Sequence, residues 1–257
     1  MNPYRKAVPT LSQQRGFSLI EMAVVLMILG LLLGGLLSAV SQTTENTRRA
    51  DTNAKLKQIE EALYGFAQAN GRLPCPATNA SAGAEAAPLG VGNCTVTRGF
   101  LPAATLGIAG AINNDGLLTD SWGNPYRYAI ASSQLLAAPI RDFASVNGLR
   151  HVYNNQAAVA ANWLRVCSAT PCLPGPPPVN ITAPNVPAIV LSMGSNWASF
   201  SSAEETENVG TTMGAYPIPA NNDFVSTLYN ETQFDDLIIW LSPNILFSRM
   251  ISAGKLP

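Results

Sequence analysis

An uninterrupted apolar run, from Phe17 to Val40, dominates the N-terminal part of the chain, and Glu21 is its only ionisable residue. A helix needs about 20 residues to cross the hydrocarbon core of a bilayer, so the run predicts a transmembrane helix over about 17–40. The segment before it has three basic residues and no acidic one: Arg5, Lys6 and Arg15. A basic flank stays on the cytoplasmic side, which places the rest of the chain across the membrane.

The junction between the polar segment and the apolar run differs from that of a secretory signal. A secretory signal has an apolar core of about 7 to 15 residues, followed by small residues at the cleavage site. Here the apolar run is longer, and the small residue, Gly16, precedes it. Ala39-Val40-Ser41 offers a conventional cleavage site, but the length of the apolar run argues against its use.

Gly16, Phe17 and Glu21 together resemble the signal of type IV pilins and pseudopilins, which prepilin peptidase recognises. The resemblance implies cleavage between Gly16 and Phe17, removal of residues 1–16 as a leader, and N-methylation of Phe17. It also implies a filament subunit whose partners are other pilin or pseudopilin subunits and an inner-membrane assembly platform. The expected location is the bacterial inner membrane, in a single pass with a cytoplasmic N-terminus and a periplasmic head, and then the filament.

A carboxylate in the apolar run indicates a functional residue. Placing such a charge in a membrane helix costs about 2 to 3 kcal/mol, so Glu21 is expected to have a cationic partner. Cleavage would create one, since the new α-amino group of Phe17 has a reference pKa of about 7.7 to 8.0. In the pilin family this pair forms between neighbouring subunits, which implies a role for Glu21 in assembly. The alternative is that Glu21 only reaches the headgroup layer from the first helical turns.

The apolar helix is expected to continue beyond the membrane. Four apolar residues recur at steps of three and four, the spacing of one helical face: Leu56, Ile59, Leu63 and Phe66. Asn70-Gly71 then supplies a stop signal. The sequence predicts one long helix over 17–70, transmembrane in its lower half and amphipathic in its upper half. A head over 71–257 follows it.

The head combines short β-like runs with turns rich in Gly, Pro, Asn and Ser. This pattern predicts an α+β domain, in which a small antiparallel sheet packs on the long helix. The expected strands are 126–130, 163–166, 188–192 and 237–241. Ser242 as N-cap, Pro243 at the first helical position and Gly254 after the end predict a short C-terminal helix.

Two fragments of the head resemble the major pseudopilin of type II secretion. One is Asp120–Tyr128, with the sequence DSWGNPYRY, and the other is Leu191–Gly194, with the sequence LSMG. The resemblance implies that the first fragment leads into a strand and that the second ends a strand in a turn. Between them lies an inserted segment, about 131–187, which contains the stiff stretch Pro174–Pro178.

All four cysteines lie downstream of the apolar run: Cys75, Cys94, Cys167 and Cys172. If the predicted orientation holds, they enter an oxidising compartment, where disulfides are the default and free buried thiols are the alternative. Four cysteines allow three connectivities, and the sequence alone does not choose among them. We favour the nearest-neighbour pairs, Cys75–Cys94 and Cys167–Cys172.

In the secretion family an acidic loop near the end of the chain binds calcium. The candidates here are three aspartates, with three glutamates before them: Asp223, Asp235, Asp236, Glu204, Glu205 and Glu207. Their spacing matches no calcium-loop pattern, and an exposed, solvated loop is the simpler interpretation. We therefore expect no cofactor, with calcium as the one candidate.

Charge and motif content argue against two other functional classes. Acidic residues outnumber basic ones from residue 71 onwards, so the head lacks the positive charge of a nucleic-acid-binding protein. The one histidine, His151, accompanies no Gly-x-Ser-x-Gly motif and no phosphate loop, so an enzyme is not indicated. The sequence predicts a structural subunit of a type IV filament, assembled into a periplasmic pseudopilus. A minor or tip pilin with an adhesin-like head is the alternative.

Overall fold

A computed structural model of the chain describes residues 16–86, 94–131, 143–156, 163–173, 175, 177–198, 202–209, 222–230 and 233–257, apart from the side chains of 33–41. The chain divides into two compact units, Met1–Thr47 and Arg48–Pro257. The long helix α1 (Leu19–Asn70) begins in the first unit and ends in the second. The helix expected from the sequence is therefore present as one element.

Within the second unit, α1 buries one face in the head. The fully buried residues of that face follow a spacing of three and four: Thr52, Leu56, Ile59, Leu63 and Ala67. Because 3.6 residues make one turn, this spacing places them in a single stripe. Phe66, which the sequence placed in the stripe, is only half-buried, and Ala67 takes its position. The stripe shares its core with the sheet residues Tyr128 and Val190.

The long helix ends where the sequence predicts. Gly71 has a φ of 70°, a left-handed conformation that glycine adopts without a Cβ penalty, and its N–H donates to the Ala67 carbonyl at 2.8 Å. The Asn70 side chain donates to the Phe66 carbonyl at 2.9 Å. The Gly71 bond satisfies the Ala67 carbonyl, one of the last four in the helix, which have no partner within it.

The first sheet of the head has the strand order β1-β2-β5-β7, and every pair in it is antiparallel. Its strands are β1 (Arg98–Phe100), β2 (Arg127–Ile130), β5 (Ala188–Ser192) and β7 (Leu237–Trp240). All five residues of β5 are buried, so this central strand is covered on both faces. The strands expected over 126–130, 188–192 and 237–241 are confirmed to within one residue. The α+β class is confirmed with them.

A second sheet has the order β4-β3-β6. It is built from β4 (Ile181–Val186), β3 (Leu164–Cys167) and β6 (Asp223–Val225), and β3 pairs antiparallel with β4 but parallel with β6. The strand expected over 163–166 is present, but its placement in the sheet beside the long helix was wrong. The reason is that the inserted segment, about 131–187, supplies both β3 and β4, so that β3 pairs within a separate sheet.

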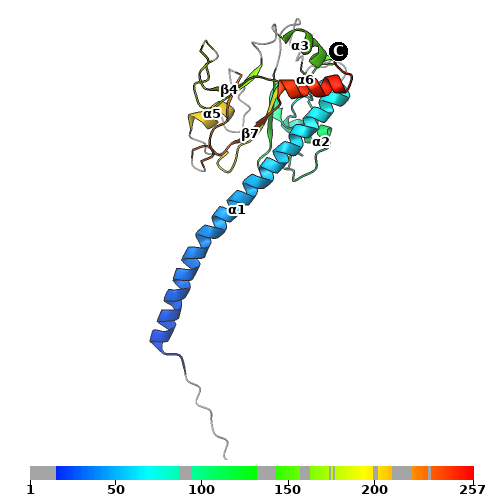
Figure 1. The fold of residues 1–257 in the computed structure, drawn as a ribbon. Coiled ribbons are helices and arrows are strands. Elements are labelled where there is room, and N and C mark those ends of the chain that lie inside the picture. The colour runs from blue at the N-terminus through cyan, green and yellow to red at the C-terminus, as the bar shows by residue number, and fades with distance from the viewer. Residues whose placement is uncertain are drawn as a thin grey trace, which may run out of the picture. The chain divides into compact units, whose positions relative to one another are not determined.

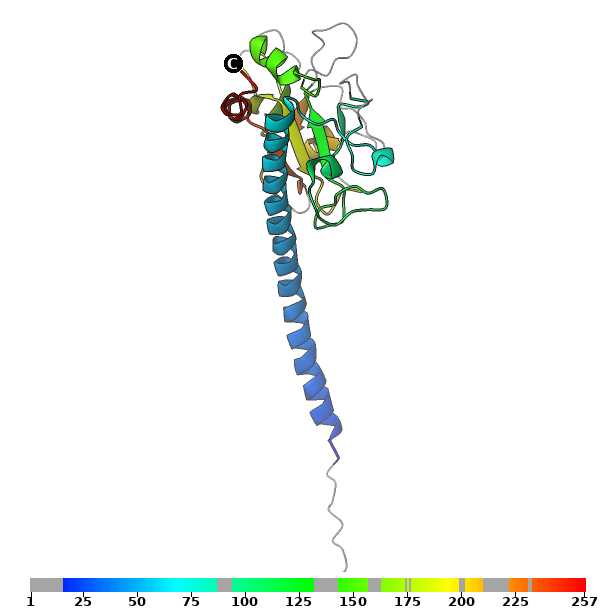
Figure 2. The ribbon, with the colours of Figure 1, turned by 90° about the vertical axis from the view of Figure 1, so that its right-hand side faces the viewer.

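Short helices complete the head. They are η1 (Asn79–Ser81), α2 (Ala103–Leu106), α3 (Gly148–Asn154), α5 (Ala203–Val209) and α6 (Pro243–Ser252). Figures 1 and 2 show α6, in red, beside the C-terminal part of α1, where Arg249 forms an ion pair with Glu61. Ser242 is the N-cap of α6, and Gly254 follows its end with a φ of 68°, as predicted.

Candidate functional site

The junction expected to be processed lies outside the helix. Gly16, Phe17 and Ser18 have no regular secondary structure, and all three are exposed. The Phe17 side chain is 78% exposed. Apart from the two chain neighbours of Gly16, no described residue lies within 4 Å of the place that a Cβ on Gly16 would take. The peptide between Gly16 and Phe17 is therefore accessible.

Ser18 is the N-cap of α1, a feature that the sequence analysis missed. Its hydroxyl accepts a hydrogen bond from the Glu21 N–H at 3.2 Å, and its carbonyl accepts one from the Met22 N–H at 3.2 Å. Serine followed three residues later by glutamate is the pattern of a capping box, of which the structure contains the serine half. This spacing of Ser18 and Glu21 can be recognised in the sequence alone. It places Glu21 in the first turn of α1, where the helix dipole favours a negative charge.

The helix of the first unit exposes large apolar side chains. Over the described part of the chain, no helix has both the length and the mean hydropathy of a membrane span. The exposed apolar side chains of this segment are Phe17, Leu19, Ile20, Met22, Val24, Val25, Leu26, Met27, Ile28, Leu29, Leu31 and Leu32. Consecutive residues project in different directions from a helix, so this apolar surface extends around it. Apolar surface of this extent marks a segment that interacts with a partner or a membrane.

The two head fragments singled out in the sequence, Asp120–Tyr128 and Leu191–Gly194, lie together. Asp120 Oδ1 accepts hydrogen bonds from the Trp122 and Asn124 N–H groups, which folds the first fragment into a tight turn. Asp120 Oδ2 accepts one from the Ser192 hydroxyl, and Asn124 Nδ2 donates to the Gly194 carbonyl at 2.6 Å. The two fragments therefore form one unit, where β2 begins and β5 ends.

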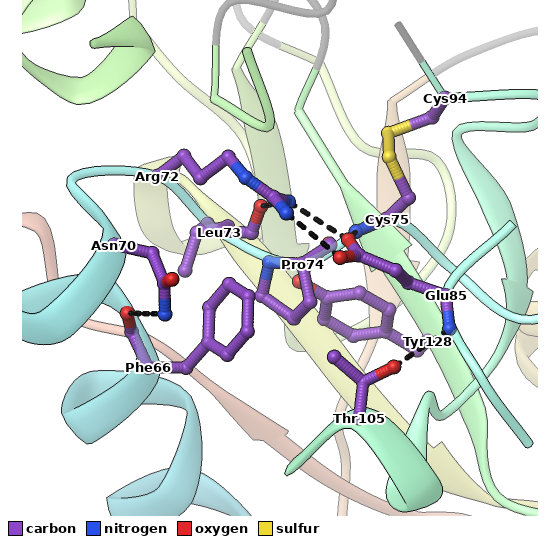
Figure 3. Close-up of polar contacts among 10 residues, drawn as sticks. All are labelled: Phe66, Asn70, Arg72, Leu73, Pro74, Cys75, Glu85, Cys94, Thr105 and Tyr128. Atoms are coloured by element: carbon purple, nitrogen blue, oxygen red, sulfur yellow. Dashed lines mark hydrogen bonds and ion pairs between the residues drawn. A yellow bond between two sulfur atoms is a disulfide. The ribbon is translucent and has the colours of Figure 1, made fainter. Parts of the chain in front are cut away.

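A second polar cluster ties the end of α1 to the loop that follows it (Figure 3). Arg72 Nη1 and Nη2 each donate to one carboxylate oxygen of Glu85, both at 2.7 Å. Glu85 also accepts from the Cys75 N–H at 3.0 Å, and its own N–H donates to Thr105 Oγ1 at 2.8 Å. Figure 3 shows this arrangement beside the disulfide from Cys75 to Cys94. The loop is thus held by an ion pair and a covalent bond at neighbouring points.

The pKa values of this cluster reflect its pairing. Burial alone would raise the pKa of Glu85, but the hydrogen bonds from Arg72 and from the Cys75 N–H outweigh burial and hold it below its usual value. The hydrogen bond to Glu85 raises the pKa of Arg72. Burial raises the pKa of Tyr128, whose hydroxyl donates to the Pro74 carbonyl at 3.2 Å. Arg72 and Glu85 are therefore both charged at neutral pH.

Comparison with known proteins identifies a family motif around the Gly16–Phe17 junction. Residues 11–37 match the family model described as the prokaryotic N-terminal methylation motif. The chain carries a type IV prepilin-like signal. No curated protein and no solved structure matches this chain. The prepilin-like signal supports a type IV pilin-like filament subunit, and it marks structural proteins that are typically not enzymes.

Both disulfides favoured on sequence grounds are present in the head of this pilin-like chain. Cys75 is bonded to Cys94 with a sulfur–sulfur distance of 2.03 Å, and Cys167 is bonded to Cys172. None of the four cysteines is free. The bonds fit a head that folds in an oxidising compartment.

Buried acids meet near the end of β5 and the start of β7. Asp235 Oδ2 accepts hydrogen bonds from the Ser195 N–H at 2.6 Å and from the Asn196 N–H at 3.1 Å. Glu205 Oε1 accepts from the Asp235 N–H at 3.2 Å. Burial raises the pKa of Asp235 and, well above its usual value, that of Asp236, and the nearby Glu205 carboxylate raises both further. The expectation of an exposed loop for these acids was therefore wrong.

Two oxygens of this cluster, Asp235 Oδ1 and Glu205 Oε2, are buried and have no hydrogen-bond partner among the described residues. Calcium prefers carboxylate oxygens, and these two are the ones that the hydrogen bonds of the cluster leave unused. Asp223 lies elsewhere, in an ion pair with Arg165. In the described part of the chain, three potential metal ligands converge only at Cys167, Cys172 and Asp223, where the disulfide occupies both sulfurs.

Proposed function

We propose that this chain is a pseudopilin-like structural subunit of a type II secretion system, processed by prepilin peptidase and assembled into a periplasmic pseudopilus. The observation that carries the proposal is the prepilin-like signal over residues 11–37. The choice of a pseudopilus rests on Asp120–Tyr128 and Leu191–Gly194, which resemble the major pseudopilin and are hydrogen-bonded to each other.

In this proposal the residues around the junction act in turn. The basic leader, residues 1–16, stays in the cytoplasm, while the apolar segment over about 17–40 anchors the chain in the inner membrane and the head lies in the periplasm. The peptidase reaches the Gly16–Phe17 peptide because that peptide lies outside the helix. Cleavage frees the α-amino group of Phe17, which is then methylated.

After cleavage, Glu21 aligns an incoming subunit with one already assembled on the platform. A helix that leaves lipid for a helical bundle gains little hydrophobic burial, so polar pairs decide its register. An isolated carboxylate in a bundle of low dielectric constant is costly. The α-amino group of a neighbour's Phe17 supplies the positive charge that relieves this cost.

Mass spectrometry of the protein from a host with prepilin peptidase tests the processing step. The expected product begins at N-methylated Phe17. Gly16→Leu should block processing, because a bulky side chain obstructs the peptidase pocket. Gly30→Ala, which meets open space in the helix, is the matched control and should be processed normally. An intact leader in the wild type, or a product that begins at Gln42, contradicts the proposal.

Variants of Glu21 test the assembly step. Glu21→Ala should leave membrane insertion and cleavage intact but reduce assembly, as measured by cross-linking of filaments in cells. Glu21→Gln keeps the shape and removes the charge, so it separates the ion pair from packing. Asp51→Asn, at an exposed acid of the same helix, is the control. Assembly of Glu21→Ala at the wild-type level would refute the role of the carboxylate.

The alternative function is that of a minor or tip pilin with an adhesin-like head. The observation that favours it is the second sheet, β4-β3-β6, which enlarges the head beyond the sheet beside α1. Deletion of the gene separates the two functions. Loss of protein secretion with surface pili retained supports the pseudopilus. Loss of surface pili or of adhesion, with secretion retained, supports the alternative.

We also propose that Asp235 and Glu205 hold a calcium ion that stabilises the head. The proposal rests on the resemblance to the secretion family and on the two buried oxygens, Asp235 Oδ1 and Glu205 Oε2. A cation there would offset two charges that burial disfavours. Calcium, but not magnesium, which binds fewer protein ligands, should raise the thermal midpoint of residues 48–257. Asp235→Asn should abolish the rise, and an unchanged wild-type midpoint would exclude the site.

A further inference from the structure

We propose that Ser18 is a positioning residue for processing: as the cap of α1 it keeps the Gly16–Phe17 peptide out of the helix. The inference rests on the proposed function, because it concerns the substrate side of the same cleavage. It starts from two hydrogen bonds. The Ser18 hydroxyl accepts from the Glu21 N–H and the Ser18 carbonyl from the Met22 N–H, both at 3.2 Å.

The position of the cap decides whether the carbonyl of the scissile peptide, that of Gly16, is hydrogen-bonded within the helix. In a helix, each carbonyl accepts the N–H of the residue four positions later. With Ser18 as cap the first helical residue is Leu19, and the Gly16 carbonyl takes no part in the hydrogen bonds of the helix. A helix that began at Phe17 would bond the Gly16 carbonyl to the Ile20 N–H. The peptide to be cut would then be fixed in the first turn, where a peptidase cannot align it with its reacting groups.

The residues beside Ser18 explain why loss of its hydroxyl would move the helix start upstream. Serine is a strong cap and glycine an acceptable one, whereas leucine and isoleucine are poor. Without the Ser18 hydroxyl, the nearest acceptable cap is Gly16. Its carbonyl would then accept the Ile20 N–H as the first hydrogen bond of the helix. A later start, at Leu19 or Ile20, would lack a good cap. In an apolar surrounding it would also leave N–H groups without partners.

Glu21 contributes its backbone N–H to the same cap. It occupies the third position of the helix, where the acid of a capping box is found. Glutamine serves the same position in that motif. Because the Ser18 hydroxyl accepts from the backbone N–H of residue 21, Glu21→Gln keeps the cap, although the variant loses the charge that assembly requires.

The rate of cleavage of the full-length chain by prepilin peptidase in membranes tests the inference. The ratio of precursor to product is measured by mass spectrometry over time. Ser18→Ala should slow cleavage about five-fold, which corresponds to the typical loss of a cap, about 1 kcal/mol. Ser18→Thr and Ser18→Asn retain a side-chain cap and should stay within about two-fold of the wild type.

Three outcomes would separate the possible failures. If Gly16→Leu is cut as fast as the wild type, the proposed processing itself is wrong. If Gly16→Leu is blocked but Ser18→Ala is cut at the wild-type rate, the positioning role is overturned and the proposed function stands. If Ser18→Thr and Ser18→Asn are slowed as much as Ser18→Ala, the peptidase reads serine itself, which also overturns the role.

Hydrogen exchange supplies a readout that does not depend on the peptidase. In Ser18→Ala the helix is expected to begin at Phe17, so the Ile20 amide should gain a partner and exchange more slowly than in the wild type. Ser18→Thr should show the wild-type exchange at Ile20. Unchanged exchange at Ile20 in Ser18→Ala would overturn the proposed shift of the helix start.

Discussion

The carboxylate of Asp235 occupies the space that a side chain at position 194 would need. A Cβ on Gly194 would overlap the carboxylate carbon and both oxygens of Asp235, and Gly194 has a φ of 60°. Glycine therefore lets the acid approach the N–H groups of Ser195 and Asn196, to which it is hydrogen-bonded. The turn after β5 and the start of β7 depend on this close approach.

Gly194→Ala should destabilise residues 48–257 by about 3 kcal/mol, since overpacking costs about 1 to 3 kcal/mol and a left-handed alanine about 1 to 2 kcal/mol. Urea unfolding measures the loss. Gly107→Ala is the matched control, because Gly107 has a φ of 68° and open space where its Cβ would lie. Gly107→Ala should lose only the free energy that a left-handed alanine costs, about 1 to 2 kcal/mol. Equal losses in the two variants would contradict the overlap with Asp235.

Lowering the pH should stabilise the head through Asp236. Burial raises its folded pKa well above the usual 3.8, and the carboxylates of Glu205 and Asp235 raise it further. Between the unfolded and folded pKa values, the folded chain holds a proton that the unfolded chain has released. The stabilisation is therefore fully present below the unfolded pKa and is lost as the pH rises through the folded pKa.

The measurement for Asp236 is the free energy of unfolding between about pH 4 and about pH 8 with a calcium chelator present, because a cation on Asp235 would oppose the shift. Asp236→Asn removes the titrating group, so the decline of stability with rising pH should become shallower. Asp115→Asn, at an exposed acid, should leave the wild-type decline in place. A wild-type decline in Asp236→Asn would show that another group is responsible.

The Arg72–Glu85 pair should be more strongly coupled than the Arg249–Glu61 pair. The side chains of Arg72 and Glu85 are 20% and 18% exposed, against 35% and 62% for Arg249 and Glu61. Hydrogen bonds to charged groups contribute about 1.5 to 3 kcal/mol, whereas exposed ion pairs contribute about 0 to 1 kcal/mol. Double-mutant cycles with alanine, followed by urea unfolding, measure both coupling energies. Equal values would mean that burial does not strengthen the Arg72 pair.

The two disulfides should differ in their contributions to stability. Cys75 and Cys94 are separated by 19 positions, and Cys167 and Cys172 by 5. In the chain-entropy description, replacing the first pair with serine should cost about 3 kcal/mol and the second about 2 kcal/mol. Thiol titration of the wild type under denaturing, non-reducing conditions should find no free thiol. Four free thiols would reject both bonds.

Local signals located several elements of the fold correctly. The end of α1 follows from Asn70-Gly71, because glycine adopts the left-handed conformation that ends a helix. The run Ala188–Ser192 matches β5 because it is a short apolar segment bounded by turn residues. The start of α6 follows from Ser242 and Pro243. Ser18 followed by Glu21 is the same kind of signal. It was missed because the segment was interpreted only as part of an apolar, membrane-spanning run.

The remaining features depend on contacts between distant residues. β4 contains Pro184 and is largely exposed, and β6 has only three residues, so neither shows the alternation of a typical strand. The parallel pairing of β3 with β6 cannot be read from either segment alone. Asp235 and Glu205, 30 positions apart, meet only in the folded head, so their burial had no local signal.

The place of β7 in the first sheet has a consequence for the folding of the head. β5 lies between β2 and β7, and β7 begins at Leu237, well after β5 ends at Ser192. Until Leu237–Trp240 is available, one edge of β5 has unpaired N–H and carbonyl groups along an uncharged, apolar segment. Such an edge can pair with another copy of itself. A chain in which Leu237–Trp240 has not yet paired with β5 is therefore prone to self-association, and the pairing of β7 is the step that removes this edge.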